Sequence, residues 1–262
     1  MVTQGRNPNS DEQAMKVKVK VKVKARPSSA ERLRAMHEAL VTRYGPQGWW
    51  PAETPFEVIL GAYLTQNTSW RAVERSLANL RAAGALTLEG LRSTPVEDLS
   101  ILIRPTGFHT RKAPALKAFV RMVDEEFMGS LERLRREPTD SLRKRLLALP
   151  GVGPETADAI LLYALGHATP VADQYLARIS ERHGLLTVAP GRRGYEAMAA
   201  LTREAFAVDS RSDRRELFNE THALIVAVGK AHCGKTPNCT RCPLAGDLAL
   251  KASPRSRPSE RR

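Results

Sequence analysis

Hydrophobic residues recur along this chain at spacings of three and four, the period of an α-helix with one buried face. The clearest example follows Pro154, where Ala157, Ile160 and Leu161 fall on one face before Gly166. Proline suits the first helical position because its missing N–H has no partner there, and glycine commonly ends a helix. We therefore expect a helix between Pro154 and Gly166.

The same spacing predicts helices along most of the remaining chain, with proline and glycine between them. The expected ranges are 29–44, 56–70, 86–91, 96–103, 113–127, 142–149, 173–183 and 216–229. Only Lys16 to Lys24 alternates lysine with valine, at the period of a strand, and this segment has no evident strand to pair with. The sequence therefore predicts an all-α fold with a solvated basic arm.

Composition narrows the class of partner. The chain has 262 residues, of which 42% are hydrophobic, enough for one or two domains with a real core. Its net charge of +13 favours a polyanion, nucleic acid above all, although a ribosomal or membrane-surface protein would share that charge. No run of about 18 apolar residues or signal-peptide core occurs, so we expect a cytoplasmic protein, associated with the nucleoid. Residues 1–28 and 251–262 are predicted to be basic, disordered tails.

A glycine-rich turn precedes the helix that begins at Pro154. It consists of Leu149, Pro150, Gly151, Val152 and Gly153. Two glycines one residue apart let a backbone take positive φ and approach a ligand closely. Exposed N–H groups just before a helix form a seat for phosphate.

This turn, its helix and the Pro-x-x-Asp that ends at Asp173 resemble, in order and spacing, the helix-hairpin-helix DNA glycosylase superfamily typified by endonuclease III. The resemblance implies that the hairpin grips the DNA backbone and that Asp173 is the catalytic carboxylate. Taken alone, Asp173 would be interpreted as a helix cap, a common position for aspartate. The two roles are compatible.

Further segments are similar to the 3-methyladenine DNA glycosylase branch of that superfamily, from Trp49 to Tyr175. These are WWP, FEVILGAYLTQNTSW, RPTGFHTRKA, GPETADAILLYA and VADQY. The resemblance implies that Gln66 fills the gap left in the duplex by an extruded base. It also implies a base pocket lined by Trp49, Trp50, Pro51 and Trp70. Without the resemblance, two adjacent tryptophans would suggest one in the core and one at the surface.

The expected chemistry agrees with these residues. A stacked base must first be flipped out of the duplex. Indole faces attract the positive charge of an N3- or N7-alkylated purine. Because the glycosidic bond of such a base is already weak, one carboxylate suffices to stabilise the oxocarbenium-like sugar and to orient water.

Glu155 bears on strand cleavage. Glycosylases that also cut the strand use a lysine at the matching position as a Schiff-base nucleophile, and a carboxylate cannot form that imine. We therefore expect a glycosylase without lyase activity, with Glu155 in the catalytic site. Alternatively, Glu155 is only a favourable acid in a first helical turn. No feature of the sequence assigns the lyase role to Lys112, Lys144 or Lys230.

By resemblance, the fold consists of two helical domains flanking a DNA-binding cleft. Residues 54–166 would form one domain, and residues 29–53 with 167–250 the other. The expected partner is double-stranded DNA with a damaged base, bound by a monomer away from membranes.

The C-terminal region carries Cys233, Cys239 and Cys242, which resemble the endonuclease III iron–sulfur loop without its fourth cysteine, because Leu248 takes that position. The chemistry itself needs no cofactor. A [4Fe–4S] cluster on three cysteines would need an unusual fourth ligand, such as Asp247, His232 or an outside group. A zinc site of three cysteines and one histidine is a second interpretation, and a loop that has lost its metal is a third.

The sequence therefore predicts a monofunctional glycosylase for alkylated purines. Two alternatives remain open: a glycosylase for oxidised or mismatched pyrimidines on the same fold, and a DNA-binding module without catalysis.

Overall fold

The computed structural model describes residues 26–252, and every regular element in that range is helical, which confirms the predicted all-α class. The expected tails, including Lys16 to Lys24, lie almost entirely outside the described residues. Within 26–252 no helix has the length and apolar character needed to cross a membrane. The elements are α1 (Ser29–Tyr44), α2 (Pro55–Leu64), α3 (Trp70–Ala82), α4 (Leu88–Ser93), α5 (Val96–Leu102), η1 (Arg104–Thr106), α6 (His109–Phe127), α7 (Leu131–Arg136), α8 (Thr139–Ala148), α9 (Pro154–Ala159), η2 (Ile160–Ala164), α10 (Gln174–His183), α11 (Arg192–Ala205), α12 (Arg211–Ala231) and α13 (Ala245–Ala252).

Local signals set several helix ends where the sequence predicts them. Ser28 and Glu31 form a capping box at the start of α1, and Gly45 ends that helix at a φ of +69°. Helix α12 begins five residues before the predicted Glu216, because Ser210 caps a first turn that is wholly polar. Hydrophobic spacing cannot reveal such a turn.

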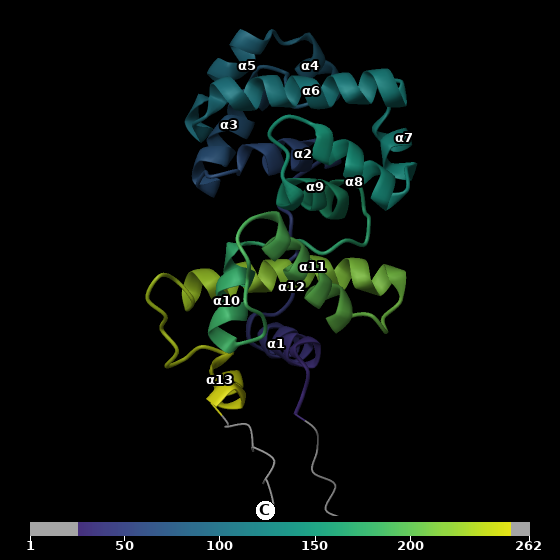
Figure 1. The fold of residues 1–262 in the computed structure, drawn as a ribbon. Helices are drawn as coiled ribbons and strands as arrows, with labels where there is room; N and C mark the ends of the chain where they lie inside the picture. The colour runs from purple at the N-terminus through teal and green to yellow at the C-terminus, as the bar shows by residue number, and fades with distance from the viewer. Residues whose placement is uncertain (1–25, 253–262) are drawn as a thin grey trace, which may run out of the picture.

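The helices form two groups (Figure 1). One group contains α2 to α9, and the other contains α1 and α10 to α13. The chain passes between the groups twice, through residues 45–54 and through residues 165–173. The first passage carries the paired tryptophans and the second ends at Asp173, so the two crossings bring both sets of predicted site residues to the junction.

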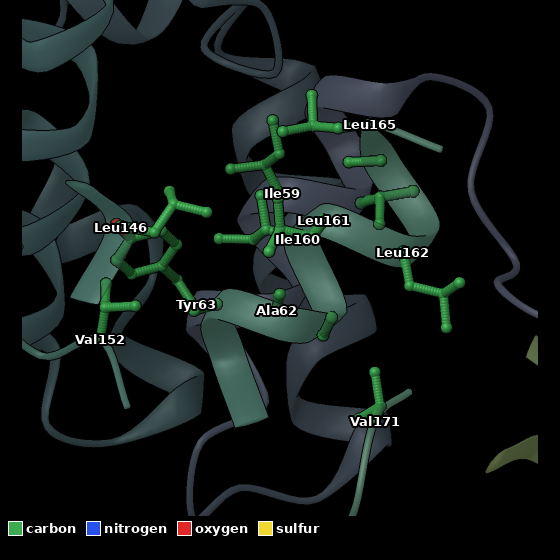
Figure 2. Packing of buried hydrophobic residues seen from close by; sticks show 14 of the residues in the cluster. Ile59, Ala62, Tyr63, Leu146, Val152, Ile160, Leu161, Leu162, Leu165 and Val171 are labelled. Carbon is green, nitrogen blue, oxygen red and sulfur yellow. The ribbon is translucent and has the colours of Figure 1, made fainter. Parts of the chain in front are cut away.

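Buried apolar side chains fix the helix that follows the hairpin. Ile160 and Leu161 are fully buried and lie beside Ile59 of α2 (Figure 2). Val152, the central hydrophobic residue of the hairpin, is buried near Tyr63. Each such side chain contributes about 1.5–3 kcal/mol by leaving water, so the hairpin is anchored through Val152 while its glycines stay exposed.

A buried ionic network joins the two groups behind the hairpin helix. Arg143 of α8 donates to Asp158 of α9 at 2.7 Å and to Glu196 of α11 at 2.9 Å. The hydroxyl of Tyr195 donates to the second oxygen of Asp158 at 2.8 Å. Because a buried carboxylate is costly without partners, these contacts hold α9 against α11 in one arrangement.

Candidate active site

The hairpin joins α8 to α9 and presents its backbone outward. Gly151 has a φ of +75°, a conformation that favours glycine. Gly153, in contrast, is extended at φ −92°, so only Gly151 uses the positive φ that the glycine pair allows. A Cβ placed on Gly153 would meet no protein atom within 4 Å. Packing therefore does not require glycine there, and its bare backbone stays open to a partner.

Gln66 lies directly against the hairpin. Its amide nitrogen donates to the carbonyl oxygen of Gly151 and to the hydroxyl of Thr156, both at 2.9 Å. The side chain is half-buried, and its hydrogen bonds tie the loop after α2 to the hairpin.

Lys112 holds the loop after α2 through hydrogen bonds from its side chain. Its buried ammonium group donates to the carbonyl oxygens of Leu64 and Thr106 and to the hydroxyl of Thr68, at 2.8, 3.1 and 2.9 Å. Burial lowers the pKa of Lys112 to about 8. All three donors of the ammonium are used, so Lys112 serves the loop that carries Gln66.

Phe108 is a surface feature that no sequence pattern predicted. Its side chain is 58% exposed, and its backbone is left-handed with a φ of +47°. Phe108, Gln66 and Gly151 border one cavity of about 200 Å³. The only sequence signal was an aromatic residue after Gly107 in a turn, which composition alone does not distinguish from a core residue.

The three tryptophans form one cluster. Ring centroids lie 5.7 Å apart for Trp49 and Trp50, 5.5 Å for Trp50 and Trp70, and 6.4 Å for Trp49 and Trp70. All three are half-buried, and Pro51 beside them is exposed. Gly61 of α2 makes room for Trp50, because a Cβ there would lie 3.3 Å from its ring. The division into one core and one surface tryptophan is therefore not the arrangement seen.

Asp173 is the N-cap of α10, as its residue type alone predicts. Its Oδ1 accepts a hydrogen bond from the backbone N–H of Leu176 at 2.8 Å. Its Oδ2 lies 3.9 Å from Nε2 of His222 on α12. The cap uses one carboxylate oxygen and leaves the other for a second role.

Tyr163 and His222 connect the tryptophan cluster to Asp173, a role that no sequence pattern predicted for either residue. The ring of Tyr163 lies 5.3 Å from that of Trp50, and its hydroxyl lies 2.5 Å from Nδ1 of His222. Burial lowers the pKa of His222, although the negative charge of Asp173 partly opposes this, so the imidazole is neutral. A lone tyrosine and a lone histidine 59 positions apart give no sequence signal of this contact.

Glu155 lies in the first turn of α9. Its side chain is exposed to solvent, although protein atoms nearby desolvate the carboxyl group. This desolvation, with the negative charge of Asp173 as the second cause, raises the pKa of Glu155 to about 7. The two carboxyl groups predicted to be catalytic are therefore near enough for the charge of Asp173 to act on Glu155.

The three cysteines border a second, strongly apolar cavity of about 200 Å³, together with His232 and Leu248. Arg182 donates to the sulfur of Cys233 at 3.0 Å. The carboxylate of Asp247 already binds Arg32 at 2.5 Å and His183 at 2.8 Å, so it is engaged by these residues. Within residues 26–252 no three His, Cys, Asp or Glu side chains gather closely enough to hold a single metal ion. Sulfurs spread around a cavity fit a group larger than one ion, such as an iron–sulfur cluster, better than zinc.

Comparison with known proteins agrees with this architecture. The profile of the HhH-GPD superfamily base excision DNA repair proteins matches residues 60–204. MJ1434 of Methanocaldococcus jannaschii, named as a candidate DNA repair glycosylase, is 38% identical over 82% of this chain and 94% of its own length. Endonuclease III of Bacillus subtilis is 26% identical over 72% of this chain and 78% of its own length.

Among solved structures, H. pylori 3-methyladenine DNA glycosylase (MagIII) bound to 1,N6-ethenoadenine superposes with a TM-score of 0.66 at 28% identity. The match covers 78% of this chain and 98% of that one. The chain therefore belongs to the HhH-GPD superfamily and is a base excision repair DNA glycosylase.

Proposed function

We propose that this glycosylase excises alkylated, positively charged purines of the 3-methyladenine type from double-stranded DNA, without cutting the strand. The observation that carries the proposal is the continuous path from the tryptophan cluster through Tyr163 and His222 to Asp173. An aromatic site and a carboxylate are joined within one buried unit. The ligand that MagIII holds, an etheno-modified adenine, agrees with a damaged purine as substrate.

The tryptophans supply the recognition of charge. Indole faces attract a cation by about 0.5–2 kcal/mol each, more when the site is desolvated. A neutral base gains only stacking from the same rings. The cluster thus discriminates in favour of bases that alkylation has made cationic.

Asp173 supplies the hydrolysis. With Oδ1 held by the backbone of Leu176, the Oδ2 atom faces the oxocarbenium-like sugar and accepts a proton from the attacking water. Water adds to C1′ of the sugar, the glycosidic bond breaks, and its electron pair leaves with the cationic base. The base departs neutral, so no acid needs to protonate it.

Glu155 supports the proposed absence of strand cleavage. A lyase forms an imine between lysine and the sugar, and Glu155 cannot. With a pKa near 7, it is partly protonated at neutral pH, which limits the negative charge that it adds beside Asp173. Borohydride should therefore trap no covalent complex between this protein and DNA.

The hairpin and the residues around Gln66 hold the duplex. The backbone N–H groups of Gly151 and Gly153, both exposed before α9, bind a phosphate, whereas the N–H of Val152 is used within the turn. Gln66 enters the space that the flipped base leaves, and Phe108 stacks against the neighbouring bases as an exposed aromatic wedge.

The cysteine loop is proposed to bind an iron–sulfur cluster through Cys233, Cys239 and Cys242. Such a cluster would be held by thiolates and would stabilise the segment between α12 and α13. Of the candidate fourth ligands, His232 borders the cavity, whereas Asp247 is engaged by Arg32 and His183.

The test is base release from a panel of duplexes, each with a single damaged base. The panel contains 3-methyladenine, 7-methylguanine, 1,N6-ethenoadenine, thymine glycol and mismatched thymine or uracil. The proposal expects release of the cationic purines in preference to the pyrimidines, with an intact abasic strand as the second product. Preferential release of the pyrimidines, or strand cleavage with a trapped imine, would refute it.

A further inference from the structure

Residues from three elements meet at Asp173. Tyr163 comes from η2, Asp173 from the passage that opens α10, and His222 from the middle of α12. The histidine and aspartate side chains are each less than a tenth exposed. Bulk water therefore contributes little to their interaction, and each polar atom depends on the others for its partner.

A π-helical turn carries Tyr163. The N–H of Leu165 donates to the carbonyl oxygen of Ile160, five residues earlier, at 3.1 Å. Such wide turns inside a helix occur frequently at functional sites. Here Tyr163 lies against Trp50 on one side and His222 on the other, whereas Leu161 and Leu162 are buried in the core.

The chemistry of the partners fixes the tautomer of His222. A neutral imidazole has one donor nitrogen and one acceptor nitrogen. The negative charge of the carboxylate 3.9 Å from Nε2 favours a proton on Nε2, which makes Nδ1 the acceptor. Tyr163 must then donate its hydroxyl proton to Nδ1, which agrees with a pKa that burial and the charges of Asp173 and Glu220 raise well above its usual value.

The separation between His222 and Asp173 indicates what this arrangement does. At 3.9 Å, Nε2 and Oδ2 are too far apart for a direct hydrogen bond but close enough for electrostatic attraction. Because Oδ1 is fixed by the cap, the attraction of the Nε2–H group acts on the orientation of Oδ2. A rigid donor from a neutral ring orients the carboxylate without neutralising it, as a protonated histidine would.

We propose that Tyr163 and His222 form a positioning pair that orients Oδ2 of Asp173 toward the sugar and the attacking water. The proposal rests on Asp173 being the catalytic carboxylate of the proposed function. Neither residue contacts the reacting atoms, so their substitution should slow base release without weakening the binding of DNA.

Tyr163→Phe is the test variant, because it removes the donor to Nδ1 and keeps the ring against Trp50. Tyr195→Phe is the matched control, because it removes a buried hydroxyl that donates to Asp158, outside this path. Each protein is assayed for the single-turnover rate of base release, for affinity to a duplex with a stable abasic analogue, and for thermal unfolding. Nitrogen-15 NMR of the imidazole reports the tautomer of His222.

We expect Tyr163→Phe to slow base release about tenfold, equivalent to about 1.4 kcal/mol of transition-state stabilisation. Affinity for the abasic analogue should stay within about twofold of the wild type, as for an interaction used only in the transition state. The tautomer signal should change from protonated Nε2 to a mixture, and Tyr195→Phe should alter neither rate nor signal. In the Asp173→Asn background, Tyr163→Phe should have no further effect on the rate.

If the wild type releases base and Tyr163→Phe does so at the same rate, the positioning pair is overturned while the proposed function stands. The same holds if the Tyr195→Phe control loses as much rate as Tyr163→Phe. A wild-type signal from protonated Nδ1 would also overturn it. If the wild type releases no base from any duplex, the proposed function fails, and the positioning pair fails with it.

Discussion

Replacing Asp173 separates its two roles, because the two oxygens of the carboxylate make different contacts. Asp173→Asn keeps a carbonyl oxygen that can accept the N–H of Leu176, whereas Asp173→Ala removes the cap as well as the charge. Asparagine and aspartate are about equal as N-caps, and loss of the cap to alanine costs about 1 kcal/mol. In a domain of this size that corresponds to about 2–4 °C in the temperature of unfolding.

Catalysis should respond differently from stability. Loss of one preorganised electrostatic group typically lowers the rate about 10²–10³-fold, or about 2.7–4 kcal/mol. We expect both variants to lose at least this much in single-turnover release of a methylated purine. Asp173→Asn should unfold within about 1 °C of the wild type, since it keeps the cap, and Asp173→Ala should unfold about 2–4 °C lower.

The assay pairs base release with calorimetry and with binding to an abasic-analogue duplex, which should be unchanged in the asparagine variant. Release by Asp173→Asn within about tenfold of the wild type would refute the catalytic assignment, because one positioned charge contributes more than that. Equal destabilisation by Asp173→Asn and Asp173→Ala would refute the interpretation that Oδ1 caps the helix while Oδ2 serves catalysis.

Further predictions concern the hairpin, the second carboxyl group, the wedge and the cysteine loop. Gly153→Ala should fold normally, since its Cβ meets no atom and its φ is ordinary, but should weaken DNA binding in a fluorescence anisotropy assay; unchanged affinity would argue against a phosphate there. Because the pKa of Glu155 is raised from 4.5 to about 7 on folding, the folded state binds more protons in that window and stability falls as pH rises through it. Glu155→Gln should therefore gain thermal stability relative to the wild type between pH 5 and pH 8, and a pH-independent difference would contradict the shifted pKa. Phe108→Ala should leave the unfolding temperature unchanged, because the ring is largely exposed, and should reduce base release more from a fully paired duplex than from a mismatched one; equal reductions would exclude a wedge. Cys242→Ser should lose the iron and visible absorbance of anaerobically purified wild type, and a wild type without iron would contradict the proposed cluster.

Hydrogen bonds between residues close in the sequence explain why so much of the fold could be predicted. A helix forms its hydrogen bonds within a few residues, so Pro154, Gly45 and Ser28 mark helix ends wherever the rest of the chain lies. The capping role of Asp173 is local for the same reason, since its partner is the N–H three residues later. Helix α12 was predicted too short because its first turn is polar. Its hydrophobic spacing therefore begins only after that turn, whereas its hydrogen bonding begins at Ser210.

The sequence by itself therefore determined the all-helical class, the turn before α9 and the capping position of Asp173. The catalytic roles of Asp173 and Glu155 stay predictions from the resemblance. Only the tertiary structure decided that three tryptophans form one cluster, that Gly153 is extended, and that Tyr163 meets His222 across 59 positions. The pKa of Glu155 belongs to the same class, because it depends on the protein around the carboxyl group and on the charge of Asp173. Such contacts join residues whose separation along the chain carries no periodic signal, and they exist only after the two groups of helices have packed.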